Sequence, residues 1–113
     1  MMEYHSTRNE NLRATAAEAI LRGLAPDGGL YTMSALPRLA MPLHELLALD
    51  TLSMAREILS ALLPSFSHEE MDGLVRAAYH DKFETEDLTP TVAVGEDAVL
   101  ELFRGPNTSF SIY

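Results

Sequence analysis

The residues best suited to chemistry include four histidines, and their spacing does not build a self-contained metal site. No two of them are three or four residues apart, the spacing that places two ligands on one helix face; they are His5, His44, His68 and His80. The sequence has no cysteine, which removes thiolate ligands and disulfides. We therefore expect no metal site and interpret each histidine as a structural or surface residue.

Carboxylates are plentiful, but a structural role accounts for them. Glu69, Glu70 and Asp72 crowd the start of a predicted helix, where negative charge interacts favourably with the helix dipole. Glu101 lies within an apolar strand, where a buried carboxylate is costly unless it is paired. We expect Glu101 to face solvent or to meet an arginine, and we predict no catalytic carboxylate.

Two glycine-containing segments could bind a ligand. Residues 26–29 read PDGG, which lacks the spacing of a dinucleotide or nucleoside triphosphate loop, so we interpret them as a turn. Residues 104–106 read RGP and place a cation beside a backbone break directly after a strand, where loops often carry binding groups.

Composition limits the class of protein. The chain has 113 residues, enough for one domain, and 47% of them are hydrophobic, which favours a folded core over disorder. Its 17 acidic and 8 basic residues give a net charge of -9, which repels a nucleic-acid backbone. The first 24 residues mix charged and apolar side chains, unlike a signal peptide or membrane span. We expect no nucleic-acid or membrane partner and a cytoplasmic location.

Three main helices are predicted from capping residues and apolar spacing. Capping boxes start helices at Thr15 and Ser67, and these helices run to about Gly23 and Tyr79. Asp50 or Thr51 caps the helix between them, which stops before a proline at position 64. A brief uncapped helical turn is possible over residues 43–49.

Strands are predicted around these helices. Residues 3–7 form a short edge strand and residues 30–32 a second one, while residues 91–94 and 98–103 form a hairpin through a turn at residues 95–97. The predicted fold class is α+β, with three main helices packed on a small sheet that includes a C-terminal β-hairpin.

Several segments together resemble the amino-terminal domain of threonine synthases, which use pyridoxal phosphate (PLP). YHSTR at residues 4–8 resembles the family's Y-x-S-T-R, and AILRGLAPDGGLY at residues 19–31 resembles its A-I-x-x-G-L-A-P-D-G-G-L-Y. The similarity continues through LELF at residues 100–103 and the glycine and proline at residues 105–106. It therefore extends along nearly the whole chain.

The resemblance implies a parent reaction in which O-phosphohomoserine yields threonine and phosphate, with PLP held as a Schiff base by a lysine. The family's final segment reads L-E-L-F-H-G-P-T, two residues, then F-K-D. Here Arg104 stands at the histidine position and Ser111 at the lysine position. A serine hydroxyl cannot form an aldimine. We therefore expect no PLP on this chain by itself and no catalytic residue within it.

The resemblance also implies a domain organisation. Residues 1–106 would form the threonine synthase-like domain, and residues 107–113 a divergent tail at the start of a PLP-binding domain beyond them. The implied partner is that catalytic domain of the same polypeptide. Five residues would face its active site: Ser6, Thr7, Arg8, Gly105 and Pro106.

Other interpretations remain open. The chain could be a stand-alone protein-interaction module, or could self-associate through an apolar surface exposed by the absence of a catalytic domain. Ser6 and Thr7 could simply close a strand end, and Arg8 could pair with a surface acid. A free-standing enzyme would have to use Lys82, the single lysine, for PLP.

Overall fold

The structure is a computed structural model that describes residues 3–80 and 87–104. It divides into two compact units, Met1–Val75 and Arg76–Tyr113. Each unit is considered separately below.

The first unit contains a three-stranded antiparallel sheet. Its strands are β1 (Tyr4–Ser6), β2 (Arg13–Ala14) and β3 (Tyr31–Met33), in the order β2-β1-β3. The predicted strands at residues 3–7 and 30–32 are thus confirmed, but the predicted edge position of β1 is wrong. A tight turn brings β2 back onto β1: Ser6 N donates to Leu12 O at 3.0 Å, and Asn11 N donates to Asn9 Oδ1 at 2.9 Å. β2 is too short to show an alternating pattern in the sequence.

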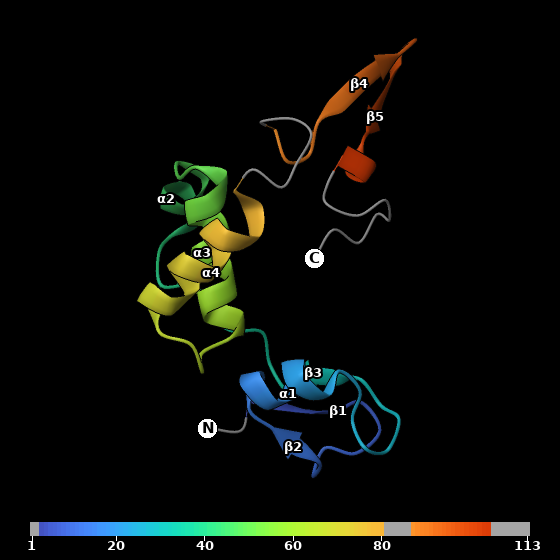
Figure 1. The fold of residues 1–113 in the computed structure, drawn as a ribbon, viewed down its shortest axis with the longest axis vertical. Coiled ribbons are helices and arrows are strands. Elements are labelled where there is room, and N and C mark those ends of the chain that lie inside the picture. Colours follow the sequence, from blue (N-terminus) through green and yellow to red (C-terminus); the bar gives the residue numbers. More distant parts are fainter. Residues whose placement is uncertain (1–2, 81–86, 105–113) are drawn as a thin grey trace. The chain divides into compact units, whose positions relative to one another are not determined.

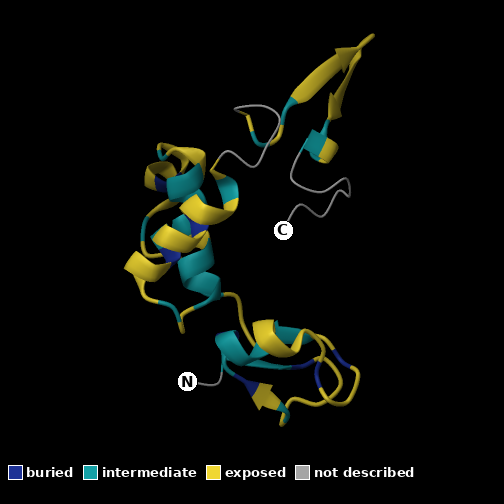
Figure 2. Cartoon of the chain, in the orientation of Figure 1, coloured by how far each residue is buried: buried dark blue, intermediate teal, exposed yellow. Residues whose placement is uncertain are grey.

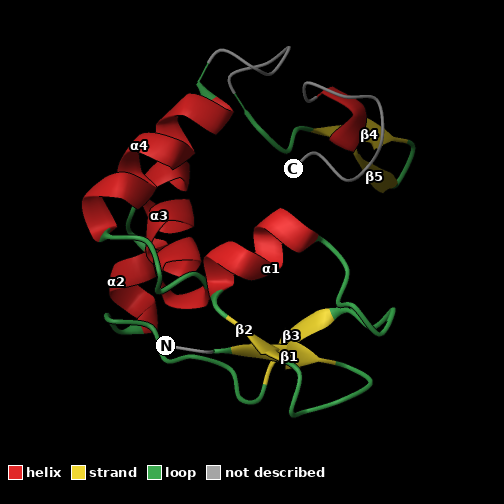
Figure 3. Cartoon of the chain, turned by 60° about the horizontal axis from the view of Figure 1, so that its bottom comes forward, coloured by secondary structure: helices red, strands yellow, loops and turns green. Residues whose placement is uncertain are grey.

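Helix α1 (Ala16–Arg22) follows β2, and Figure 3 shows it beside the sheet. Both bonds of the predicted capping box are present, because Glu18 N donates to Thr15 Oγ1 at 3.2 Å and Thr15 N donates to Glu18 Oε2 at 3.0 Å. The helix ends where Gly23 adopts a φ of 73°, which a residue with a Cβ rarely does. Both predicted ends of this helix are confirmed.

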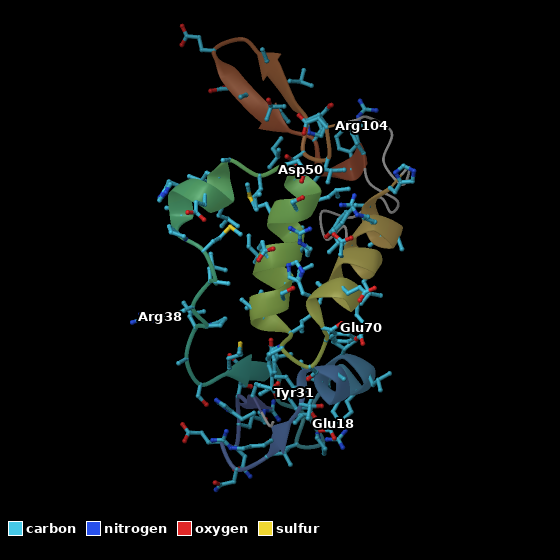
Figure 4. The ribbon with its side chains drawn as sticks, turned by 90° about the vertical axis from the view of Figure 1, so that its left-hand side faces the viewer. Glu18, Tyr31, Arg38, Asp50, Glu70 and Arg104 are labelled. Carbon is cyan, nitrogen blue, oxygen red and sulfur yellow. The ribbon has the colours of Figure 1, made fainter. Side chains whose placement is uncertain are left out.

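The remaining helices of the chain are α2 (Leu43–Leu47), α3 (Thr51–Leu62) and α4 (His68–Tyr79), and Figure 1 shows α3 and α4 side by side. Asp50 caps α3 by accepting from Ser53 N at 2.8 Å, at the end of the helix labelled in Figure 4. Ser67 Oγ accepts from Glu70 N at 3.1 Å at the start of α4. The predicted caps therefore set these helix starts.

A charged cluster joins α3 to α4. Arg56 contacts Asp72 at 3.1 Å, and Glu57 Oε1 lies 2.8 Å from His68 Nε2. The hydrogen bond from the His68 ring, together with that from Arg56, holds the pKa of Glu57 below its ordinary value despite burial. Glu57 therefore stays ionised between its two cationic neighbours.

Few side chains are fully buried in the first unit. The apolar ones are mostly small, and they are Ala14, Ala16, Ala25, Leu46, Met71 and Val75. The Tyr4 hydroxyl, whose pKa is raised by burial, donates to the carbonyl of Leu62 and so links β1 to the end of α3. Such long-range hydrogen bonds matter more where the apolar core is small.

The second unit contains a hairpin of β4 (Thr91–Val94) and β5 (Asp97–Leu100), with Val94 opposite Asp97 and Gly95 at a φ of 64°. The predicted hairpin is confirmed, but its second strand is one residue longer at its start and ends at Leu100. The predicted extension to Phe103 is wrong, because residues Leu102–Arg104 form a 3-10 turn, η1. Arg104 Nε reaches Glu101 at 3.4 Å, the arginine partner expected for this carboxylate.

The α+β class is confirmed, with three main helices, small antiparallel sheets and a C-terminal hairpin. Within the described residues the strands fall into two separate sheets, β2-β1-β3 and β4-β5. No helix in this part of the chain is long and apolar enough to cross a membrane.

Replacing the α3 cap tests how this helix start is fixed. Asp50→Ala removes the acceptor for Ser53 N, so we expect the free energy of unfolding in urea to fall by about 1 kcal/mol. Asp50→Asn keeps an acceptor oxygen and should retain most of that stability. Equal losses in the two variants would show that the capping oxygen is not the cause.

Candidate functional site

Two segments far apart in the sequence meet beside the three-stranded sheet. Ser6 pairs with Tyr31 in the β1–β3 register, and the pairing continues beyond the strands, where Thr7 N donates to Leu30 O at 2.8 Å. In return, Leu30 N donates to Thr7 Oγ1 at 3.0 Å. We call residues 6–8 together with residues 25–30 the loop pair.

Ser6 is the centre of the loop pair. It is 1% exposed and is the buried polar residue of the described chain. Its hydroxyl donates to both carboxylate oxygens of Asp27, at 2.7 and 3.0 Å, and accepts from Arg8 N at 3.1 Å. The Ser6 hydroxyl is thus fully engaged in holding the two segments together.

Asp27 completes this lock. Its Oδ1 also accepts from Gly29 N at 2.9 Å. The Gly29 amide and then the Ser6 hydroxyl, by donating to the carboxylate, lower the pKa of Asp27. A carboxylate whose pKa is lowered is a poor proton acceptor at neutral pH, so Asp27 is suited to structure and not to general-base catalysis.

Arg8 closes the outer side of the loop pair. It is exposed, and its Nη1 donates to the carbonyl oxygen of Asp27 at 3.0 Å. Gly28 lies beneath it with a φ of 82°, and a Cβ there would be only 2.9 Å from Arg8 Nη1. The close approach of Arg8 therefore requires a glycine at this position.

Gly29 is required for a different reason. A Cβ at Gly29 would collide with Ser6 Oγ and would lie 3.0 Å from Asp27 Oδ1. The amides of Gly28 and Gly29 already donate within the loop, to Ala25 O and Asp27 Oδ1, both at 2.9 Å. They are not free to cradle an anion, and the interpretation of PDGG as a turn is confirmed.

The structure therefore brings three of the predicted site residues together: Ser6, Thr7 and Arg8. Their orientation toward an active site stays a prediction. Gly105, Pro106 and the serine at position 111 lie outside the described residues, as does the proposed boundary between residues 106 and 107.

Sequence reasoning missed the central role of Asp27, which it took only as a turn residue. An aspartate two residues before a glycine is typical of a turn in which the carboxylate accepts a backbone N–H, and that signal was available. The sequence contains no comparable signal for the cluster of Arg56, Glu57, His68 and Asp72.

The described residues do not fit PLP. A Schiff base needs a primary amine, and the single lysine of the sequence, Lys82, lies outside them. The backbone amides of the PDGG turn are engaged internally and cannot hold a phosphate. Within residues 3–80 and 87–104 there is also no group of three or more side chains that could hold a metal ion.

Comparisons with known proteins give a consistent result. Residues 3–79 match the family model described as the threonine synthase N terminus. The threonine synthase of Methylobacillus glycogenes is 32% identical over 119 residues, which cover 96% of this chain and 25% of that protein.

Solved structures agree with these matches. The PLP-bound threonine synthase from Brucella melitensis aligns with a TM-score of 0.76 and 31% identity, over 97% of this chain and 24% of that one. The Escherichia coli threonine synthase aligns with a TM-score of 0.74 and 30% identity, over 93% of this chain and 24% of that one. The chain thus spans about a quarter of the length of the relatives it matches.

Two glycine substitutions should act in opposite directions. Gly29→Ala places a methyl group against Ser6 Oγ, so we expect the free energy of unfolding to fall by about 1–3 kcal/mol. Gly73→Ala is the matched control, since it lies inside α4 with open space around it and should raise stability by about 0.5–1 kcal/mol. Shifts of the same sign in urea denaturation would contradict this account of the loop pair.

The Ser6–Asp27 lock should weaken in acid. Because the pKa of Asp27 is lower in the folded state, its contribution is present above the ordinary aspartate value of about 4 and is lost as the pH falls through the lowered value. The difference in unfolding free energy between wild type and Asp27→Asn should therefore shrink between about pH 5 and pH 2. Glu57 titrates in both proteins and cancels. A difference that stays constant over this range would rule out the lock.

Proposed function

The chain belongs to the threonine synthase family, and from this we propose that it is the amino-terminal scaffold of an enzyme that makes threonine. The observation that carries the proposal is the match of residues 3–79 to the family's N terminus, within alignments that continue along almost the whole chain. Because the chain spans a quarter of its relatives, the reaction is proposed for a complete polypeptide. That reaction converts O-phosphohomoserine to threonine and phosphate with PLP.

The polar groups of the loop pair support a scaffold role over a chemical one. The hydroxyls of Ser6 and Thr7 are engaged with Asp27 and Leu30, so both residues act by positioning the backbone. Arg8 differs, because it is exposed and its guanidinium makes one hydrogen bond among the described residues, to Asp27 O. We assign to Arg8 the role of facing an anionic group, such as the phosphate or carboxylate of the substrate.

The cofactor is assigned to the remainder of such a polypeptide. The described residues lack an amine for the aldehyde of PLP, and the register of the resemblance puts Ser111 at the lysine position. No step of the reaction is therefore given to this chain beyond shaping the site and its charge. A cytoplasmic location fits this biosynthetic role.

A second candidate function is self-association, which several exposed apolar side chains favour. Leu21 on α1 is 86% exposed and Leu36 is 90% exposed. Sedimentation of the chain at several concentrations separates the two candidates, because a chain that stays monomeric has no self-associating surface.

A chimera tests the scaffold role. Residues 1–106 of this chain would replace the aligned first quarter of the Escherichia coli threonine synthase, whose own lysine segment would follow. We expect the chimera to release phosphate from O-phosphohomoserine and to restore growth of a threonine auxotroph. The same enzyme without its first quarter should be at least about 100-fold less active, because its active site is no longer positioned.

Two variants of the chimera locate the effect. Arg8→Ala should raise KM for O-phosphohomoserine by roughly tenfold, the loss of one charge-assisted hydrogen bond, with a smaller change in kcat. Arg38→Ala is the matched control, an arginine in the loop before α2. A folded chimera that binds PLP but forms no threonine would contradict the scaffold role, and an unchanged KM in Arg8→Ala would contradict the role of Arg8 alone.

A further inference from the structure

The β4–β5 hairpin is a two-stranded sheet without a third strand among the described residues. Every residue of both strands is exposed, as Figure 2 shows by its colour. An isolated two-stranded hairpin is marginally stable in water, and a third strand or a covering layer is normally needed. The hairpin therefore has the character of a part whose partner lies elsewhere.

Both faces of the hairpin are apolar. The register puts Val92 opposite Val99 on one face, and on the other puts Ala93 opposite Ala98 beside Leu100. The larger side chains are 43–57% exposed, namely Val92, Val94, Val99 and Leu100. Nearly continuous apolar strands are typical of sheets that are covered on both faces, whereas strands with one wet face alternate.

The outer edges of the hairpin are also unprotected. Natural edge strands are usually blunted by lysine, proline or an inward charge. Within β4 and β5 the one charged residue is Asp97, beside the turn, and Pro90 lies before β4 begins. The free N–H and C=O groups of the outer edges can therefore accept another strand.

The comparisons indicate what the missing layer is. The family model for the N terminus ends at residue 79, and the first compact unit ends at Val75. The whole-enzyme alignments continue over 96–97% of the chain and so include the hairpin. The hairpin thus belongs to the stretch that connects the amino-terminal region with the other three quarters of these enzymes.

We propose that the β4–β5 hairpin is a docking arm that adds its open edge to a β-sheet in the catalytic portion of a threonine synthase polypeptide, which then covers both of its faces. This inference rests on the proposed function. It differs from a dimer contact, because a second copy would bring its own Glu96 and Asp97 and a net charge of -9 against the same strands.

Hydrogen–deuterium exchange tests the docking arm in the chimera described above. Backbone amides on the outer edges of β4 and β5 should exchange fast in the chain alone. In the chimera we expect the same amides to exchange at least about 100-fold more slowly, because a new strand pairs with them. The three-stranded sheet of the first unit serves as an internal reference and should change little.

Charged substitutions identify the covered faces. Val92→Glu and Leu100→Glu probe the two faces of the hairpin, and each should reduce hairpin protection and lower the Tm of the chimera. Leu36→Glu is the matched control, an exposed leucine in a loop of the first unit, and it should change neither. If the glutamate variants do not fold, the exchange measurement on the unsubstituted chimera still decides.

The outcomes separate this proposal from the proposed function. An active chimera whose hairpin exchanges as fast as in the chain alone overturns the docking arm and leaves the scaffold role intact. A protected hairpin in an inactive chimera supports the arm and counts against the scaffold role. Concentration-dependent protection in the chain alone, with dimers in sedimentation, would make a second copy the occupant and overturn the proposal.

Discussion

The hydrogen bond from the Ser6 hydroxyl to the Asp27 carboxylate is the constraint on which the first unit depends. It joins the end of β1 to the turn that leads into β3, and it does so from a position that water does not reach. A slip of one residue in the β1–β3 register would turn Ser6 away from Asp27 and leave a buried polar group unpaired, which costs about 1–3 kcal/mol. The lock therefore specifies the register as well as the stability of the sheet.

Helix boundaries could be predicted from the sequence because their causes are local. Thr15, Asp50 and Ser67 each accept from an amide three residues ahead, so the pattern and the contact lie within one turn. The β4–β5 hairpin was predictable for the same reason, since a two-residue turn with Gly95 at positive φ fixes its register.

The remaining features depend on contacts between distant residues. The position of β1 in the middle of its sheet follows from the two-residue β2, and the end of β5 at Leu100 follows from the turn closed by Arg104. At the candidate site, the sequence grouped Ser6 with its two neighbours but not with Asp27, 21 residues away. Local spacing carries no information about which of several acidic residues will accept that bond.

The two units use their residues in complementary ways. The loop pair satisfies its polar groups internally, which makes it rigid and leaves little that could react. The hairpin leaves both its edges and its apolar faces unsatisfied, which makes it dependent on a neighbour. A domain built in this way contributes a fixed shape through its first part and attachment through its second. Chemistry in such an arrangement falls to whatever the hairpin pairs with, which is consistent with a chain whose described residues offer no amine for PLP.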